Sequence, residues 1–230
     1  MEYIIIILAS IAFLAILAFV LELNIKKLKA IGENKELDEL TNLFPENIDI
    51  CRSILKMLGN EEVKVTEEKD SKTSLYVVVN NSITIANIRS SYTRIQTIAH
   101  ECVHSIQRKK MLWFNFIYTN IYMLYFFIVS LLTVFKVINT PYIFLTILII
   151  MGMIQYFIRS GLETEAMIKA RYIAKDYLEQ NDICSSENIK RIVKEYDRLN
   201  NMGIKLVNFD ILARNFVKII IYCVVCIVFC

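Results

Sequence analysis

The only two histidines of this 230-residue chain, His100 and His104, lie four residues apart and flank Glu101. In a helix, residues i and i+4 project from the same face, so both imidazoles can bind one metal ion. Glu101 then projects beside the metal, where its carboxylate can act as a general base toward water. The spacing predicts the H-E-x-x-H helix of a zinc hydrolase. The competing interpretation is an exposed helix that carries two histidines by chance.

A catalytic zinc site needs a third protein ligand and an open position for water. The chain has no third histidine, and Gln107 and Lys110 stand where the longer metzincin motif requires glycine and histidine. The third ligand is therefore expected to be a carboxylate, which predicts a zinc site made of two histidines and one glutamate.

The composition indicates a membrane protein, since 56% of the residues are hydrophobic and the mean hydropathy is +0.46. Residues 3–23 form an apolar run long enough to cross a bilayer as a helix. Two further apolar runs, 116–135 and 142–158, are joined by a segment with Asn139 and Pro141, which predicts a transmembrane hairpin. A fourth span, 214–230, reaches membrane length if the basic side chains near its start extend to the interface.

The basic residues predict the orientation of these spans by the positive-inside rule. They cluster after the first span, before the second and after the third: Lys26, Lys27, Lys29, Lys35, Arg108, Lys109, Lys110 and Arg159. We expect an integral protein of a bacterial cytoplasmic membrane with its amino terminus outside and its active site facing the cytosol. The predicted segments are an anchor (1–23), a cytosolic subdomain (24–111), a transmembrane hairpin (112–160), a cytosolic helical segment (161–213) and a last transmembrane helix (214–230).

The charge and the cysteines agree with this placement. The net charge of +3 is small, and its distribution indicates topology rather than a nucleic-acid partner. A reducing cytosol disfavours disulfides, and Cys223, Cys226 and Cys230 lie in the apolar tail. The helical position of Cys102 directs it away from the metal face and into packing.

Short elements are predicted around the motif. Period-two patterns predict strands at 62–66, 74–79 and 83–86, with a turn at 80–82. Helical patterns cover 48–58, the motif itself after an N-cap at Ser90 or Ser91, 163–180, and 186–200 with a cap at Ser185 or Ser186 and a stop at 201–203. A sheet followed by the motif helix is a zincin arrangement, in which the sheet edge can bind an extended peptide.

The hairpin narrows the choice of the third ligand, because it returns the chain to the membrane face that carries the motif. Glu163 and Glu165 follow directly. Ala166 and Ala170 share the helix face of Glu163, and their small size permits a close approach to the motif helix. Glu163 is therefore favoured and Glu165 is the alternative. Either residue could instead be an acidic first turn that the helix dipole stabilises.

These motifs resemble the membrane-bound neutral zinc metallopeptidases of the YugP type. That family combines an N-terminal span and a small cytosolic domain with H-E-x-G-H-A-x-Q, a hairpin, and an E-x-x-A-S ligand helix. The chain matches from Ala99 to Glu101, from His104 to Gln107, and at Glu163 with Ala166 and Ala170. The E-x-x-A element is also similar to that of membrane proteases related to the CAAX-processing enzymes. The chain departs from the family at Val103 in place of glycine, at 75–77 in place of Asp-His-Tyr-Asp, and at Gly161-Leu162 in place of Pro-Val.

The expected fold is therefore mainly α, with about four transmembrane helices and a small α+β zincin-like cytosolic domain that carries the H-E-x-x-H helix. The expected function is a zinc metalloendopeptidase in which His100, His104 and Glu163 hold Zn²⁺ and Glu101 is the general base. Arg171 and Tyr172 are candidates for the oxyanion donor. The expected partners are a peptide or membrane-protein substrate and the lipid bilayer, without nucleic acid, and the sequence leaves the oligomeric state open. A non-catalytic zincin-like protein that binds a peptide or partner is the alternative, and an immunity-type membrane protein is a third class.

Overall fold

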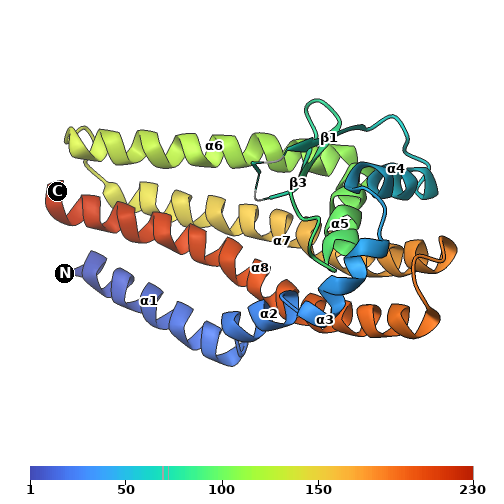
Figure 1. Cartoon of the computed structure of the whole chain (residues 1–230). Helices are drawn as coiled ribbons and strands as arrows, with labels where there is room; N and C mark the ends of the chain where they lie inside the picture. The colour runs from blue at the N-terminus through green and yellow to red at the C-terminus, as the bar shows by residue number, and fades with distance from the viewer. Residues whose placement is uncertain (69, 72, 230) are drawn as a thin grey trace. The chain divides into compact units, whose positions relative to one another are not determined.

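The computed structural model describes residues 1–68, 70–71 and 73–229, and most of these residues are helical (Figure 1). The chain is thus mainly α, as predicted. The elements follow in the order α1 (Glu2–Val20), α2 (Ile25–Gly32), α3 (Lys35–Asp38), the 3₁₀ helix η1 (Glu39–Leu43), α4 (Asn47–Met57), β1 (Lys64–Glu68), β2 (Leu75–Val77), β3 (Ser82–Ala86), α5 (Arg94–Ile106), α6 (Lys109–Val134), α7 (Pro141–Gln180) and α8 (Ser186–Phe229).

Residue contacts divide the chain into two compact units. Unit 1 consists of Met1–Leu23, Trp113–Gly161 and the chain from Lys205 onward, and unit 2 consists of Asn24–Leu112 and Leu162–Ile204. Three of the four boundaries between the units fall inside α6, α7 and α8, and the other lies between α1 and α2. The five segments predicted from hydropathy describe where the chain enters and leaves a membrane, and they stay a prediction.

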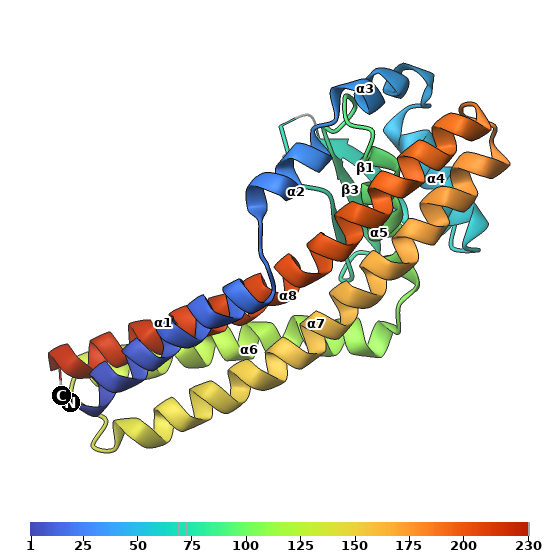
Figure 2. The ribbon, with the colours of Figure 1, turned by 90° about the horizontal axis from the view of Figure 1, so that it is seen from below.

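Unit 1 is a set of apolar helices that lie side by side (Figure 2). In the described part of the chain, α1, α6, α7 and α8 are the four helices that are long and apolar enough to cross a membrane. Polar contacts join them: the Tyr118 hydroxyl on α6 donates to the Met151 carbonyl at 3.1 Å, and the Asn215 amide on α8 donates to the Gly152 carbonyl at 2.9 Å. Large apolar side chains such as Phe19 and Phe157 point outward and are mostly exposed.

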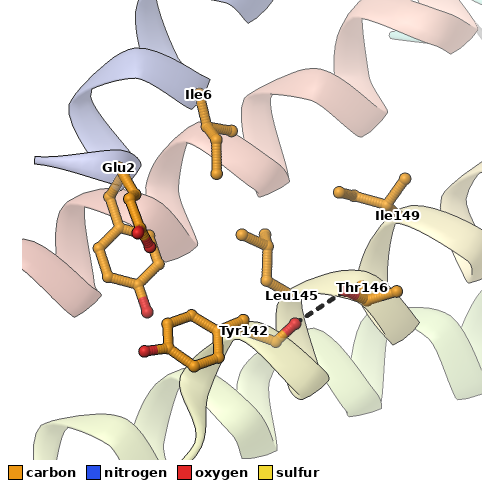
Figure 3. A pocket seen from close by; sticks show the side chains of 7 residues that line it. Glu2, Ile6, Tyr142, Leu145, Thr146 and Ile149 are labelled. Atoms are coloured by element: carbon orange, nitrogen blue, oxygen red, sulfur yellow. Dashed lines mark hydrogen bonds between the residues drawn. The ribbon is translucent and has the colours of Figure 1, made fainter.

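A pocket in unit 1 lies between the first turns of α1 and α7 (Figure 3). Ile6, Leu145 and Ile149 form its apolar lining, and Glu2 supplies its one carboxylate among the described lining residues. The Thr146 hydroxyl donates to the Tyr142 carbonyl of its own helix at 2.9 Å. The pocket therefore holds no group of metal ligands.

Unit 2 contains the sheet, which has three strands in the order β1-β3-β2 among the described residues. β1 runs parallel to β3, and β2 pairs antiparallel with β3. The turn between β2 and β3 covers 78–81 rather than the predicted 80–82, because β2 ends at Val77 and Ser82 is already part of β3. β1 begins at Lys64, two residues later than predicted. Isoleucines of α4 and α5 that are fully buried form the core beside the sheet: Ile50, Ile54, Ile95 and Ile98. The motif helix α5 is thus held by its apolar face.

The predicted N-cap of the motif helix is wrong, because α5 begins at Arg94 after Thr93 rather than after Ser90 or Ser91. The Ser91 hydroxyl accepts a hydrogen bond from the Thr93 backbone N–H at 3.2 Å. Tyr92 is held outside the helix, since its backbone N–H donates to the Asp38 carboxylate at 2.9 Å and its hydroxyl to the Ile31 carbonyl at 2.8 Å. Tertiary contacts therefore delay the start of the helix.

Two predicted helix boundaries are also wrong. Glu163 does not lie in a first turn, because α7 runs without a break from Pro141 to Gln180. The predicted stop at 201–203 lies inside α8, whose N-cap region is Ser185, with its hydroxyl accepting from the Asn188 backbone N–H. A Cβ atom at Gly203 would lie 2.6 Å from the methyl carbon of the flexible Met167 side chain, so α7 and α8 pack closely at the predicted stop. The helix dipole at an N-terminus therefore does not account for Glu163.

The cysteines of the described residues carry free thiols, and Cys230 lies outside those residues. Cys102 is fully buried and its Sγ lies 3.6 Å from Cys51 Sγ, so it packs away from the histidines as predicted. Its hydrogen bond with Cys51 and its burial raise the pKa of the Cys102 thiol.

Candidate metal centre

The motif helix is fixed at both ends by polar contacts within unit 2. Near its start, the buried Arg94 guanidinium donates to the Thr41 and Phe44 carbonyls at 3.1 and 3.0 Å. Near its end, the Asn60 amide donates to the Ser105 carbonyl at 3.1 Å and to its hydroxyl at 2.9 Å. These bonds and the apolar face set the rotation of α5, and so the direction in which its histidines point.

The structure brings His100, His104 and Glu163 together. The Nε2 atoms of the two imidazoles lie 3.0 Å apart, and Glu163 Oε2 lies 3.4 Å from His100 Nε2 and 3.6 Å from His104 Nε2. Among the described residues, these three form the group of histidine, cysteine and acidic side chains able to hold a metal ion. Their side chains are between 13% and 23% exposed, so water reaches the group.

The spacing of the three atoms fits a small tetrahedral ion. Ligand atoms about 2.0–2.2 Å from zinc at tetrahedral angles lie about 3.3–3.5 Å from one another. The three observed separations, 3.0, 3.4 and 3.6 Å, bracket this value. Two imidazole nitrogens and one carboxylate oxygen are also a donor set that catalytic zinc accepts, with a fourth position left for water. The residues therefore fit a metal ion, and the structure leaves its identity open.

The acidic side chains of the group favour positive charge beside them. Burial alone would lower the pKa of His104, but hydrogen bonding with Glu163 and the charges of Glu163 and Glu101 outweigh it and raise that pKa. Burial would raise the pKa of Glu163, yet hydrogen bonds and charges from His100 and His104 hold it well below its usual range. Both shifts favour a negative carboxylate facing positive charge. A metal ion would compete with protons for the same imidazole nitrogens.

Glu165, the alternative ligand of the sequence prediction, is engaged elsewhere. One of its oxygens accepts from Lys169 Nζ at 2.5 Å and the other accepts from the Gln107 amide at 2.9 Å. The hydrogen bond from Lys169 lowers the pKa of Glu165. Between the two predicted candidates, the geometry therefore favours Glu163.

Glu101 lies beside the histidines on α5 and is 7% exposed. Its Oε2 accepts a hydrogen bond of 2.7 Å from the backbone N–H of Tyr76, on the edge strand β2. Because this N–H points away from β3, it takes no part in the sheet ladder. One carboxylate oxygen is thus oriented by the sheet, and sequence reasoning could not find this contact because a backbone N–H leaves no mark in the sequence.

Gln107 is a second group that the sequence did not single out for a role. Its Oε1 lies 2.8 Å from His104 Nδ1, and its Nε2 donates to the Leu162 carbonyl at 2.8 Å. The available signal was its place three residues after His104, which is near enough in the chain for the two side chains to meet, although Gln107 itself follows the end of α5.

The two oxyanion candidates of the sequence prediction are not brought to the group. Arg171 lies eight residues after Glu163, about 12 Å further along the axis of α7. Its guanidinium pairs with Asp197 at 2.9 Å and stacks on the Tyr172 ring at 4.3 Å. These contacts give both residues a structural role on α7.

Comparisons of the chain with protein-family models, with curated proteins and with solved structures found no match.

Proposed function

We propose that the chain is a zinc-dependent metalloendopeptidase that works at the cytosolic surface of a membrane. The observation that carries the proposal is the convergence of His100, His104 and Glu163, with all three ligand atoms within 4.8 Å of one another and Glu101 following the first histidine. The three ligands come from α5 and α7, which lie far apart in the sequence. A pair of histidines present by chance would have no reason to meet a partly buried carboxylate there.

Each residue of the group has a distinct role in the proposed hydrolysis. His100, His104 and Glu163 hold the zinc ion, which when bound supplies Lewis acidity that acidifies water and polarises a carbonyl. Glu101 takes a proton from the attacking water as its oxygen bonds to the carbonyl carbon, and then delivers the proton to the amine when the carbon–nitrogen bond breaks. The Tyr76 N–H holds one oxygen of Glu101 in place for this exchange.

The proposed membrane location rests on the four apolar helices and on the basic residues at their ends. Along the chain, Glu163 follows the apolar run 142–158 by only five residues, and His104 precedes the run 116–135 by twelve. The ligands therefore belong to polar segments that border the spans. A substrate at this position is a peptide or membrane-protein segment near the bilayer.

The proposed substrate is extended, since β2 is an edge strand next to Glu101. Leu75 of that strand is 57% exposed, which suits contact with an apolar peptide. The motifs shared with the YugP-type peptidases support the same activity, and we propose that the chain is a divergent relative of that family.

Zinc content and cleavage test the proposal together. We expect the protein purified in detergent to contain about one zinc per chain and to cleave casein or a membrane-protein substrate. Removal of zinc with a chelator should abolish cleavage, and zinc returned in equimolar amount should restore it, because the bound ion supplies the Lewis acidity that the proposed hydrolysis needs. Zinc without cleavage of any substrate in a broad peptide library would favour the non-catalytic binding protein. The absence of zinc would contradict the proposal and favour an immunity-type membrane protein.

The proposed topology predicts which sites a protease outside the cell can reach. A tag at the amino terminus and a tag in the loop between α6 and α7 should be removed from intact spheroplasts. A tag between Asn181 and Asp182, in the loop between α7 and α8, should be removed only after permeabilisation. Immunoblots of each tagged chain measure this, and the reverse pattern would place the metal ligands outside the cell.

A further inference from the structure

Gln107, the residue that follows α5, is 5% exposed and connects the motif helix to α7 within unit 2. Its amide makes three contacts: Oε1 lies 2.8 Å from His104 Nδ1, while Nε2 donates to the Leu162 carbonyl at 2.8 Å and to Glu165 Oε2 at 2.9 Å. Leu162 and Glu165 flank the ligand Glu163 in the sequence. One amide thus touches a metal-ligand imidazole and both sides of the segment that supplies the third ligand.

The partners of Gln107 determine which way its amide faces. A backbone carbonyl only accepts hydrogen bonds, and the Glu165 carboxylate, which already accepts from Lys169, is also an acceptor. The NH₂ group must therefore face Leu162 and Glu165. Rotation of the amide by half a turn would direct its oxygen at two acceptors and leave the NH₂ group facing the histidine. The carbonyl oxygen of Gln107 accordingly faces His104.

The amide orientation in turn determines that Nδ1 of the His104 ring carries a hydrogen. Oε1 is an acceptor, so His104 Nδ1 must carry the hydrogen and donate it. In a neutral imidazole the other nitrogen, Nε2, then has a free lone pair. This is the atom that lies 3.0 Å from His100 Nε2 and 3.6 Å from Glu163 Oε2. The lone pair therefore points into the group of ligands.

We propose that Gln107 is a positioning residue that locks His104 as the Nδ1–H tautomer and so presents Nε2 to the metal ion. The proposal rests on the proposed zinc site for its second half, because the tautomer is useful only if Nε2 binds a metal. Its role is to hold His104 rather than to touch zinc or substrate. The hydrogen bond from Gln107 Nε2 to the Leu162 carbonyl fixes the amide. The amide that orients His104 therefore also binds the backbone next to Glu163.

Replacement of Gln107 by Met tests the lock, because the side chain keeps its length and loses the carbonyl oxygen. The zinc affinity, measured by competition with a chromophoric chelator in detergent, should fall about tenfold to a hundredfold, the range for an outer partner of a metal ligand. The matched control is Gln96→Met on the same helix, which should stay within about threefold of the wild type. Gln107→Leu is the second variant if Gln107→Met does not fold.

A measurement on the zinc-free protein tests the effect of Gln107 on the His104 tautomer separately from zinc binding. The chain contains two histidines, so a ¹⁵N-histidine spectrum of the zinc-free protein holds only two rings. In alkaline buffer, where imidazoles are neutral, the wild type and Gln96→Met should show one ring as the Nδ1–H tautomer, and His104→Gln should remove that ring. In Gln107→Met the same ring should become a mixture of tautomers.

Both results are required. A wild-type tautomer in Gln107→Met overturns the proposal even if zinc binding weakens, because the amide would then act only through the fold. A lost tautomer with unchanged zinc affinity overturns it as well. If the wild type binds no zinc, the proposed function fails and the metal half of this proposal fails with it, while the zinc-free spectrum still decides whether Gln107 locks His104.

Discussion

Glu163→Ala should abolish stoichiometric zinc binding and cleavage, whereas Glu165→Ala should keep zinc. Glu163 Oε2 lies 3.4 and 3.6 Å from the two imidazole nitrogens, while Glu165 is bound to Lys169 and Gln107. Structural zinc sites bind with about 10–16 kcal/mol, so the loss of one of three protein ligands should cost several kcal/mol and weaken binding roughly a thousandfold or more. Metal analysis of the purified variants and titration with a chelator measure the effect.

Glu165→Ala is a matched control for Glu163→Ala, because the two residues occupy similar positions in the helix. Each lies in the interior of the unbroken helix α7, where alanine has the highest helix propensity, so neither variant should disturb the backbone. Circular dichroism in detergent checks that the helix content is kept. If Glu165→Ala lost zinc and Glu163→Ala retained it, Glu165 would have to be the third ligand. The arrangement of His100, His104 and Glu163 would then differ from that of the zinc-bound protein.

The sequence was informative wherever local spacing determines geometry. His100 and His104 share a face because the helix has a fixed period, and Glu163 was favoured over Glu165 because Ala166 and Ala170 follow it on its own face. In the structure those alanines are buried. The same holds for the apolar helices and for the turn between β2 and β3, which composition and local residue types set directly.

Other features were out of reach because they depend on contacts between distant segments. Tyr92 stays outside α5 because Asp38 and Ile31 hold it, and neither contact is visible in the residues next to the helix. Residues 201–203 are typical of a helix stop, yet α8 continues through them, with the Met167 side chain close to Gly203. Backbone hydrogen bonds continue through such a stretch when packing supports the helix and no proline interrupts it.

At the site too, the sequence predicts what depends on neighbouring residues and misses what depends on contacts between distant segments. The sequence contained the candidate ligands, but the groups that orient them are a backbone N–H of Tyr76 and an amide whose partners come from α7. Residues 75–77 form the strand that supplies this N–H. Because the contact uses the backbone, it does not depend on which side chain stands at position 76.

Glu101→Gln should keep zinc and lose cleavage. The amide has almost the same shape as the carboxylate but cannot accept the proton of the attacking water, and general bases contribute about a hundredfold to ten-thousandfold to rates. We expect kcat/KM to fall by about that factor while zinc content stays near the wild-type value, since Glu101 is not one of the three ligands. Single-turnover cleavage of a labelled peptide and metal analysis of the same sample measure the two quantities.

The hydrogen bond from Tyr76 makes this substitution conservative for the structure. The Gln side-chain oxygen can accept from the Tyr76 N–H in place of Glu101 Oε2, which leaves the NH₂ group at the position where the proton must be taken. The variant therefore changes proton transfer while the strand contact is kept. His100→Ala is the contrasting variant, because it removes a ligand and should lose zinc and cleavage together. Full activity in Glu101→Gln would contradict the assignment of Glu101 as the base, and full activity in His100→Ala would contradict the metal mechanism itself.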